Sequence, residues 1–424
     1  MSGGCEVRNV EKQKVPELRF KQEDGTEFPA WQKKKLSDLV SRITRKNVGN
    51  QTTIPLTISS QDGLVNQYDF FTKQIASKDM SGYFFLKRGE FAYNKSSSQG
   101  YDYGSIKRLD LYDTGALSTL YICFGLKDGV DSDFMATYFD SLKWYRDIYM
   151  ISTEGARNHG LLNVAPADFF ATTHFVPSDI EQQKIGEFFT KLNRSLSLAD
   201  KKLATLQTIK KGMLQKIFSQ ELRFKDDEGK EYPAWEERKL SDITVKIGSG
   251  KTPLGGSNAY QESGIPLIRS QNVENAKLSL SDVAYISEEV NAGMKNSIVR
   301  KDDILLNITG ASIGRCCIYD SAAIANVNQH VCIIRLKEGN TAFILQQMLS
   351  RYFQAQIDRV QAGGSKQGLN FKQIGSFEVG YPCLPEQQKI AAYFTALDRA
   401  IAAAQQKAAA LRTIKRGLLQ KMFV

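Results

Sequence analysis

The residues of this chain best suited to chemistry are amides, guanidinium groups, hydroxyls and lysines in stretches rich in Gly or Ser. Amides and guanidinium groups can hydrogen-bond to base edges, and lysines can neutralise phosphates. Such stretches favour exposed loops, so these side chains are candidates for contact with nucleic acid. For any one of them, a solvated loop residue without a binding role is the alternative. The candidates are Asn94, Lys95, Ser96, Lys107, Arg108, Arg157 and His159 in the first half of the chain, and Lys251, Thr252, Arg269, Gln271, Thr309, Ser312, Asn328, Gln329, Lys366 and Gln367 in the second.

One glycine-rich segment resembles part of a known type of ligand site. Residues 248–252 read GSGKT, like the end of a phosphate-binding loop that holds ATP. The first glycine of that pattern would fall at position 245, which is Val, and Pro253 stands where the following helix should begin. A glycine-rich turn entering a strand is the simpler interpretation. Lys251 and Thr252 on an exposed loop could equally contact DNA phosphate.

Catalytic and metal sites have little support in the sequence. No Asn-Pro-Pro-aromatic motif and no F-x-G-x-G segment indicates a methyltransferase. The three histidines are far apart, no CxxC is present, and no His stands near a Cys at zinc-finger spacing. Asp302 and Asp303 could form an acidic pair, but a turn that starts a strand is favoured, with Asp302 matching Gly89. We therefore expect no catalytic group and no metal on this chain.

The composition predicts a folded, basic protein. The hydrophobic fraction of 42% and the 23 Phe suffice for buried cores. A net charge of +10 and a pI of about 9.1 favour an acidic partner, nucleic acid first, although a merely basic soluble protein is the alternative. Cys123 and Cys332 fall at matching places (LYICF and HVCII), which predicts buried strand positions, reduced thiols and a cytoplasmic location. The polar N-terminus and the lack of apolar runs of roughly 18 residues predict neither a signal peptide nor a membrane anchor.

The elements that must position the candidate residues are built twice. Residues 17–39 read ELRFKQEDGTEFPAWQKKKLSDL, and residues 221–243 read ELRFKDDEGKEYPAWEERKLSDI. A second repeated segment, EQQKIGEFFTKLNR, begins at Glu181 and recurs as EQQKIAAYFTALDR from Glu386. The inserts between these segments have diverged. A retained frame with different inserts indicates two copies of one fold with two specificities.

Two features of the repeated frame suggest structural roles. Trp31 and Trp235 occupy matched positions after Pro-Ala, and we expect them to pack the frame against a helix. Lys33, Lys34 and Lys35 form a charge run at a predicted helix start. A solvated face is the default interpretation of that run, and phosphate contact is the second.

A long helix is predicted after each insert. From residue 185 an apolar residue recurs every seven positions, with a companion row four residues later, and the pattern starts again at residue 390. This spacing predicts two coiled-coil helices of about 54 Å at 1.5 Å per residue. Each companion row has one polar interruption, Lys210 in the first and Lys415 in the second. Helices related by a pseudo-two-fold axis are antiparallel, which brings the C-terminal end of the second helix near residues 18–20.

The inserts are expected to mix strands and helices. Short apolar runs bounded by Gly, Asp and Asn predict strands at 121–124, 303–307 and 331–335. Residues 135–150 and 341–360 are amphipathic and predict helices at matching places. The predicted fold class is therefore α/β (α+β), with two globular domains and two long antiparallel helices in a pseudo-two-fold duplication.

The chain resembles the specificity subunit of type I restriction–modification enzymes over essentially its whole length. The resemblance rests on the doubled frame, the helices from EQQKI to LLQKMF, and the PAW-x-x-x-K-L-S-D segment before each insert. In the second insert, GKTP from Gly250, DIL from Asp303 and GLN from Gly368 stand where that family has recurring target-recognition motifs. The first insert keeps GEF from Gly89 and GLLN from Gly160 but lacks the Gly-Lys-Thr-Pro start.

This resemblance implies a protein that recognises double-stranded DNA and is not itself an enzyme. Two target-recognition domains would each read half of an asymmetric bipartite site, and the helices would set the spacer between them. Two adenine-N6 methyltransferase subunits would dock on the helices, and two restriction subunits with motor and nuclease activity would join. S-adenosylmethionine, ATP and magnesium would belong to those partners, so this chain would have no cofactor. The implied organisation is a tail at 1–16, recognition domains at 17–180 and 221–385, and helices at 181–220 and 386–424.

Two functions from other classes are alternatives. A self-contained nuclease or ATPase is disfavoured by the incomplete phosphate-binding pattern and the lack of acidic clusters. A coiled-coil scaffold that binds proteins without DNA specificity would explain the helices. The basic charge and the divergent paired inserts disfavour that scaffold.

Overall fold

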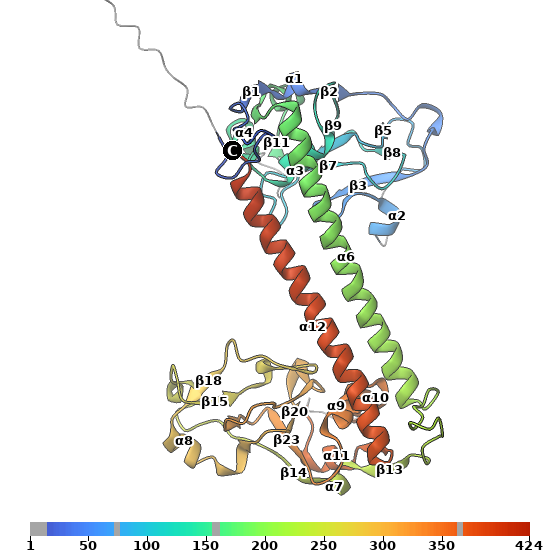
Figure 1. The fold of residues 1–424 in the computed structure, drawn as a ribbon, viewed down its shortest axis with the longest axis vertical. Helices are drawn as coiled ribbons and strands as arrows, with labels where there is room; N and C mark the ends of the chain where they lie inside the picture. Colours follow the sequence, from blue (N-terminus) through green and yellow to red (C-terminus); the bar gives the residue numbers. More distant parts are fainter. Residues whose placement is uncertain (1–14, 72–76, 155–161, 363–367) are drawn as a thin grey trace, which may run out of the picture. The chain divides into compact units, whose positions relative to one another are not determined.

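The computed structural model describes residues 15–71, 77–154, 162–362 and 368–424, and it forms two compact units (Figure 1). The first unit comprises Met1–Ala199 with Lys407–Val424, and the second comprises Asp200–Gln406. Helix α6 (Asp179–Phe218) and helix α12 (Leu384–Lys421) each contribute one half to each unit. The two long helices predicted from the heptad pattern are therefore present.

The first unit contains two four-stranded sheets, two two-stranded sheets (β1 with β12 and β10 with β11) and short helices. In chain order its elements are β1 (Gln32–Lys35), α1 (Leu36–Leu39), β2 (Val40–Ile43), η1 (Val48–Asn50), β3 (Pro55–Ser59), β4 (Gly63–Asn66), α2 (Gln67–Phe70), β5 (Phe84–Lys87), β6 (Phe91–Asn94), β7 (Ser105–Arg108), β8 (Thr114–Leu117), β9 (Ile122–Leu126), α3 (Ser132–Asp140), α4 (Tyr145–Ile151), β10 (Thr153–Glu154), β11 (Leu162–Asn163), α5 (Pro166–Ala171) and β12 (Thr173–Val176).

The second unit repeats this succession with extra short elements. Its elements are β13 (Glu236–Lys239), α7 (Leu240–Ile243), β14 (Thr244–Ser249), η2 (Gly256–Ala259), β15 (Ile265–Ile268), η3 (Ser270–Asn272), β16 (Val273–Glu274), β17 (Lys277–Leu278), β18 (Ala284–Ile286), α8 (Glu288–Ala292), η4 (Lys295–Ser297), β19 (Ile298–Val299), β20 (Ile304–Asn307), η5 (Gly310–Ser312), β21 (Cys316–Ile318), β22 (Ala325–Val327), β23 (Val331–Leu336), α9 (Thr341–Leu349), α10 (Arg351–Ala362), α11 (Phe371–Ser376) and β24 (Glu378–Tyr381).

The two units have the same sheet topology despite their divergent inserts. The first sheet has the strand order β2-β9-β6-β7 in one unit and β14-β23-β20-β21 in the other. The second sheet has the orders β4-β3-β8-β5 and β18-β15-β22-β19, with one parallel pair each, β3 with β8 and β15 with β22. The mixed fold class and the duplication are thus confirmed, and the first insert adopts the fold of the second.

In each unit, the first sheet (β2-β9-β6-β7 or β14-β23-β20-β21) is buried on both faces. In the first unit, Phe91 and Tyr93 of β6 belong to a core shared with α3 and the long helices, whereas Ala92 lies in a core shared with the second sheet. Alternate residues of a strand point to opposite faces, so one strand contributes to both cores. The predicted strands at 121–124, 303–307 and 331–335 correspond to β9, β20 and β23.

The predicted turn before β6 and β20 is present in both units. Gly89 has a φ of 86° and Asp302 a φ of 67°, so both occupy the left-handed region at matched positions. The next residue, Asp303, is buried and binds Arg335 through two contacts of 2.7 Å. In the first unit, Glu90 forms the corresponding ion pair with Arg45. The acidic residue after the turn therefore has a structural role.

The expected match between Cys123 and Cys332 is wrong by one residue. Cys123 lies opposite Ala92, whereas Cys332 lies opposite Leu306, on the other face of the corresponding sheet. Because β6 and β20 start after matched turns, the residue of β23 that matches Cys123 is Ile333. Both cysteines are nevertheless buried in strands, as predicted, and burial raises the pKa of each thiol to about 12.

Two predicted helices are interrupted, and one predicted helix start is a strand. Residues 135–150 form α3 and α4 with Leu142 at a φ of 62° between them, and residues 341–360 form α9 and α10. At Ser350 the backbone is extended and the hydroxyl caps α10 by accepting from Phe353 N. The charge run at 33–35 lies in β1, because these residues pair with β12 and the helix begins only at Leu36.

Within each unit, the halves of α6 and α12 lie side by side and antiparallel (Figure 1). In the second unit, Phe218 stacks on Phe394, and Lys210 binds Asp398 at 2.6 Å. In the first unit, the corresponding Lys415 binds Asp140 at 3.3 Å. Both lysines that interrupt the heptads are therefore paired with a carboxylate. Burial raises the pKa of Asp140, but the charges of Lys107 and Lys415 outweigh that effect and hold the pKa below its usual value.

The end of α12 meets the beginning of the repeated frame, as predicted. The amide of Leu18 donates to the Lys421 carbonyl at 3.0 Å, and Lys421 Nζ lies 2.8 Å from Glu17. The frame tryptophans pack as expected. Trp31 contacts Phe134 and Phe423, with ring centroids 6.0 Å apart in each pair. Trp235 packs on Phe218 and Phe343 in the same way.

A buried ion pair joins the two repeated segments in each unit. Arg19 binds Glu181 through contacts of 2.9 and 2.6 Å, and the side chains are 7% and 0% exposed. Arg223 binds Glu386 in the same way, with contacts of 3.2 and 2.7 Å. The arginine of ELRFK and the glutamate of EQQK are therefore partners, which gives a physical reason for finding both segments in both halves of the chain.

The glutamine and lysine that follow this glutamate anchor neighbouring loops. Gln182 accepts from Asp131 N and donates to Pro177 O, and Gln387 makes the matching bonds to Asn340 N and Pro382 O. The lysine of each EQQK segment donates to a carbonyl of the ELRFK segment, at 3.2 Å in the first unit and 2.8 Å in the second. We call this set of contacts the EQQK latch.

Replacing Glu181 by Ala should destabilise the first unit strongly, because the change leaves the guanidinium of Arg19 buried without its partner. The expected loss is about 3–5 kcal/mol in the free energy of unfolding. Glu187→Ala is the control, since Glu187 pairs with Lys191 on the same helix but both side chains are at least 73% exposed. That change should cost less than about 1 kcal/mol. Urea unfolding of the full chain measures both, and equal losses would contradict the importance of the latch.

Candidate nucleic-acid interface

Four loops of the second unit meet where the strands of its first sheet end. Thr252 Oγ1 donates to Gln329 Oε1 at 2.7 Å, and Gln329 Nε2 lies 3.0 Å from His330 Nε2. His330 Nδ1 in turn lies 2.7 Å from Thr309 Oγ1. Gly368 pairs with Thr309 as an isolated bridge, which adds the fourth loop. We call this connected set the second polar edge.

The backbone fixes the loops of the second polar edge. Gly250 N donates to Asn328 O, and Asn328 N donates to Ile268 O. Ile308 N donates to the carbonyl of His330, and Leu369 N donates to the carbonyl of Ile308. These bonds continue the ladders of β14, β23 and β20 beyond the strands. The candidates Thr252, Thr309, Asn328 and Gln329 are therefore brought together.

The GSGKT segment is a close-packed turn that leaves a strand. Gly248 belongs to β14, and no α-helix follows Lys251. A Cβ at Gly250 would lie 1.6 Å from the Val327 carbonyl oxygen, so only glycine fits there. The order of strand and turn is thus the reverse of the turn entering a strand that the sequence suggested. The glycine is required by packing of the turn against Val327.

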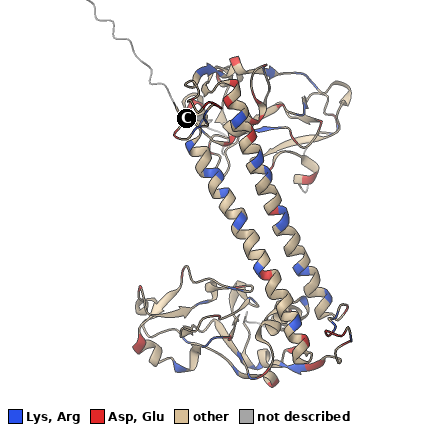
Figure 2. Ribbon diagram, in the orientation of Figure 1, with Lys and Arg blue, Asp and Glu red and all other residues tan. Residues whose placement is uncertain are grey.

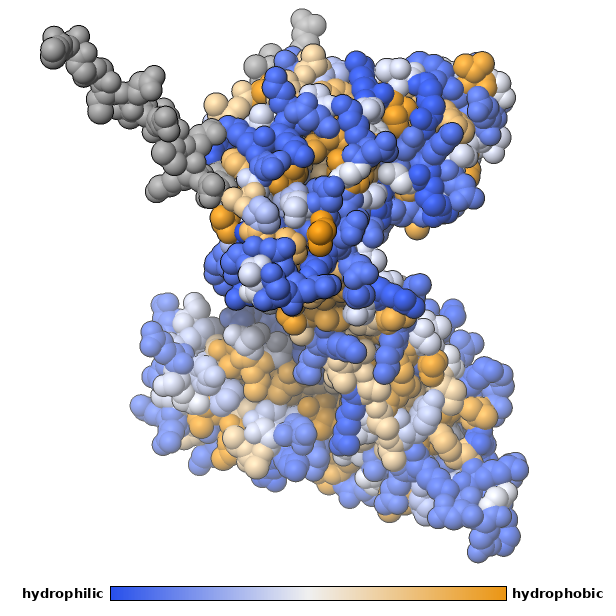
Figure 3. Space-filling view, turned by 45° about the horizontal axis from the view of Figure 1, so that its top comes forward, coloured by the Kyte–Doolittle hydropathy of each residue, from blue (hydrophilic) through white to orange (hydrophobic). Residues whose placement is uncertain are grey.

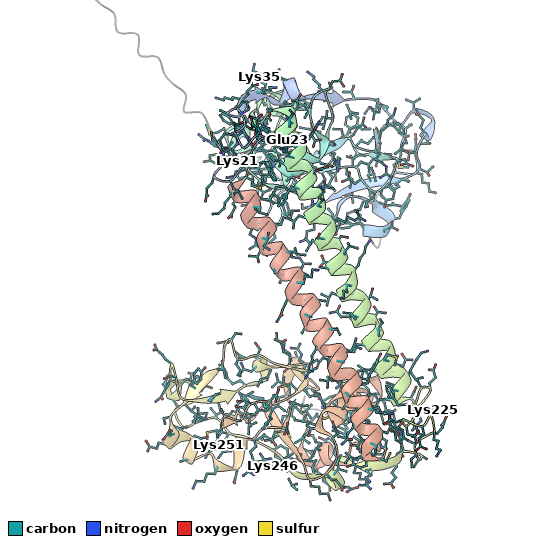
Figure 4. The ribbon with its side chains drawn as sticks, viewed as in Figure 1. Lys21, Glu23, Lys35, Lys225, Lys246 and Lys251 are labelled. Atoms are coloured by element: carbon teal, nitrogen blue, oxygen red, sulfur yellow. The ribbon has the colours of Figure 1, made fainter. Side chains whose placement is uncertain are left out.

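Lys251 is suited to contact with phosphate. Its side chain is exposed, and within the described part of the chain it has no hydrogen-bond or ion-pair partner (Figure 4). Lys246, on the same stretch, instead donates to the Asn296 carbonyl at 2.6 Å, and burial followed by nearby positive charge lowers its pKa. Of these two lysines, only Lys251 is available to an external anion.

Arg269 and Gln271 border the second polar edge but are held by an acidic residue. Arg269 donates to the Asp282 carbonyl at 2.8 Å, and Gln271 Nε2 lies 2.5 Å from the Asp282 carboxylate. Ser312 lies in η5, where its carbonyl accepts from Arg315 N. The side chains of Arg269 and Gln271 would need to exchange an internal contact or act alongside it when they bind a ligand.

The corresponding edge of the first unit is a neutral hollow. Asn94 and Ser96 line a concavity of about 330 Å³ together with hydroxyl, amide and aromatic side chains. Asn94 Oδ1 accepts from Ser96 N, and the Lys95 carbonyl accepts from Leu162 N. The other residues that line the hollow are Ile58, Ser59, Ser60, Gln61, Phe70, Ser97, Ser98, Gln99 and Tyr101.

Lys107 and Arg108 are committed to ion pairs inside the first unit. Lys107 binds Asp140 at 2.8 Å, and Arg108 binds Asp110 and Asp133 at 2.7 and 2.8 Å. Burial lowers the pKa of Arg108, but these two carboxylates outweigh that effect and raise it overall. The structure gives both residues a structural task and does not bring them into the hollow. Arg157, His159, Lys366 and Gln367 lie outside the described residues.

The structure brings further side chains to these edges that the sequence does not single out. His330 links Gln329 to Thr309. Ser60 and Gln61 line the hollow. A signal for these two residues exists, because ISSQ from residue 58 resembles IRSQ from residue 268, and each segment stands at the end of a strand.

Among the residues that the structure describes, Lys and Arg are not gathered at one further site (Figure 2). Lys and Arg are spread over both units and along both long helices, so charge alone does not locate the interface (Figure 2). Hydrophilic side chains cover much of the visible face of each unit (Figure 3). His174 is buried between the hydroxyls of Tyr138 and Thr172, at 2.8 Å from each, and burial lowers its pKa to about 4. It is therefore a neutral core residue.

No group of three or more His, Cys, Asp and Glu side chains in the described part of the chain could hold a metal ion. Within the same residues, no helix has both the length and the apolar character that crossing a membrane requires.

Replacing Gly250 by Ala should disrupt the second polar edge, because the new methyl group would collide with the Val327 carbonyl. We expect a loss of about 2 kcal/mol or more in the stability of the second unit. Gly248→Ala is the matched control two residues earlier, since a Cβ there meets nothing within 4 Å. The thermal unfolding midpoints of both variants test the claim. A Gly250 variant as stable as the Gly248 variant would contradict the close packing.

Comparisons with known proteins agree with the resemblance drawn from the sequence. Residues 233–413 match the family model described as the type I restriction modification DNA specificity domain. The chain is 24% identical over 298 residues to the type I restriction enzyme MjaVIII specificity subunit of Methanocaldococcus jannaschii, which covers 68% of each chain.

Solved structures with the same architecture support the fold. The S subunit of a type I restriction–modification system from M. genitalium superposes with a TM-score of 0.62 at 15% identity, over 97% of this chain and 99% of that one. A chain from a structure of type I R-M complex assembly and conformational transition gives a TM-score of 0.50 at 15% identity, over 93% and 98%. In the matched domain at residues 233–413, in the doubled frame and in the fold, the chain is thus similar to the specificity subunits of type I restriction–modification enzymes.

Proposed function

We propose that each unit of this chain reads one half of an asymmetric, bipartite sequence in double-stranded DNA. The family supports a role in DNA recognition without catalysis. That each unit reads its own half-site is inferred from one observation. Two units with the same sheet topology present different side chains at the same edge.

The chemistry of the two edges supports different target sequences. The second polar edge offers Lys251, the amide of Gln329 and the ring of His330. The first unit offers hydroxyls and amides around a hollow without a charged lining residue. Base edges differ in their pattern of donors and acceptors, so two chemically different edges would select different bases. An asymmetric site follows from this difference.

The long helices are proposed to hold the recognition domains at a set spacing and to dock two methyltransferase subunits. The doubled frame supports a count of two, because each half of the chain carries one copy of the EQQK latch and one long helix. Two restriction subunits would complete the complex, which would act in the cytoplasm. S-adenosylmethionine, ATP and magnesium would be held by the partner subunits.

Exchanging the second insert tests the separate reading of half-sites. Replacing residues 244–385 by the second insert of another specificity subunit should change one half of the methylated sequence and leave the other half as it was. The reason is that the insert lies wholly within the second unit. Methylation mapping of DNA from cells that contain the chimera and a methyltransferase partner gives the answer. A stable chimera that altered both halves would contradict independent recognition domains.

A matched insertion in both helices tests their proposed role in the spacing. Four residues added after Ala199 and four after Ala404 lengthen each helix by roughly 6 Å at 1.5 Å per residue. At about 3.4 Å per base pair, the unspecified spacer should grow by one or two base pairs, while both half-sites stay unchanged. The control is the insertion in α6 alone, which should disturb pairing of the helices and lower activity. An unchanged spacer in a fully active double insertion would refute the role.

A further inference from the structure

We infer that Gln329 reads an adenine in the half-site of the second unit, and that Thr252 and His330 are positioning residues for its amide. The inference rests on the proposed function and deepens it by assigning one base to one side chain. It starts from the position of Gln329, which is exposed between the half-buried residues Asn328 and His330. An exposed amide at the tip of a short connection between β22 and β23 is accessible to a DNA groove.

The backbone on both sides of Gln329 is fixed. Asn328 N donates to Ile268 O at 3.1 Å, and the Asn328 carbonyl accepts from Gly250 N at 3.2 Å. His330 N donates to the Asn328 side chain, and the His330 carbonyl accepts from Ile308 N. The loop is therefore tied to three neighbouring segments. A side chain on such a loop loses little further backbone entropy when it binds, which favours specific contact.

The amide of Gln329 is also held at both of its atoms. Its Oε1 accepts from the Thr252 hydroxyl at 2.7 Å, and its Nε2 faces His330 Nε2 at 3.0 Å. With Nε2 of the ring accepting, the proton of a neutral imidazole is on Nδ1 and is donated to Thr309 Oγ1. The chain of hydrogen bonds from Thr252 to Thr309 thus sets the orientation of the amide plane.

Counting hydrogen-bond capacity identifies the base. A glutamine amide has two acceptor sites on oxygen and two donors on nitrogen. Thr252 uses one acceptor site and His330 uses one donor, so one acceptor site and one donor remain for a ligand. Adenine presents an acceptor at N7 and a donor at N6 in the major groove, which matches this pair. Guanine presents two acceptors there, so the same amide cannot satisfy both.

Neighbouring candidates are less suited to this task. Arg269 and Gln271 are held by Asp282, and Lys251 carries a positive charge that suits phosphate. The first unit has no counterpart of the amide, because the matching connection between β8 and β9, residues 118–121, reads STLY. We therefore expect only the second unit to read adenine with an amide at this connection.

The test uses the full chain together with its methyltransferase partner, and methylation mapping of cellular DNA as the readout. The unmodified protein should give a bipartite motif with a specified A·T pair in one half. Gln329→Ala should make that position degenerate, with a loss of about 5- to 150-fold in preference for adenine, while every other position is retained. Gln329→Glu keeps the size of the side chain but offers only acceptors, and it should shift the preference towards cytosine, whose N4 is a donor.

Variants of the positioning residues separate orientation of the amide from general stability. Thr252→Val should reduce the preference for adenine without abolishing it, and Thr252→Ser should restore it, because the hydroxyl returns. Lys251→Ala is the control on the same loop and should lower methylation at all sites without altering the motif.

Three outcomes would overturn the inference. A motif unchanged in both Gln329 variants would show that the side chain reads no base. Degeneracy in the half of the motif that the first unit reads would show that Gln329 does not act in the half-site of the second unit. An unmodified protein that produced no bipartite motif at all would refute the proposed function itself, and with it this inference, so the two failures are distinguishable.

Discussion

The structure depends on the buried ion pair between the arginine of ELRFK and the glutamate of EQQK. Arg19 and Glu181, like Arg223 and Glu386, are at least four-fifths buried and join segments more than 160 residues apart. A buried charge without its partner is costly, so the helix start and the frame segment must assemble together. Once they do, the neighbouring glutamine and lysine of the latch fix the loops around them.

The latch allows the inserts to change without loss of the fold. The two units share strand order and register while their loop side chains differ. Register is set by the buried faces of the first sheet, which packs on helices on one side and on the second sheet on the other. Loops at the ends of these strands carry no such constraint. Recognition chemistry can therefore vary where the strands end, and the frame that holds those strands stays the same.

Several errors in the predictions have one cause, which is that a local pattern does not report its partners. The charge run at 33–35 reads as a helix start, but pairing with β12 makes it a strand. Cys123 and Cys332 stand in similar sequence contexts, yet the ladders place them on opposite faces. Both outcomes were decided by strand pairing with residues that the local pattern does not contain. The break of the predicted helix at 341–360 has a different cause, because the hydroxyl of Ser350 accepts from Phe353 N within the segment itself.

The sequence alone determined the duplication, the two long helices, the mixed fold class and the kind of chemistry, because repeats, heptads and alternation are written in consecutive residues. Only the tertiary structure decided which candidates act together. Thr252 bonds directly to Gln329, and His330 links Gln329 to Thr309. Lys107 and Arg108 instead form ion pairs within the first unit. The physical reason is that strand register, fixed by long-range burial, sets which loops are neighbours. No spacing along the chain records that choice.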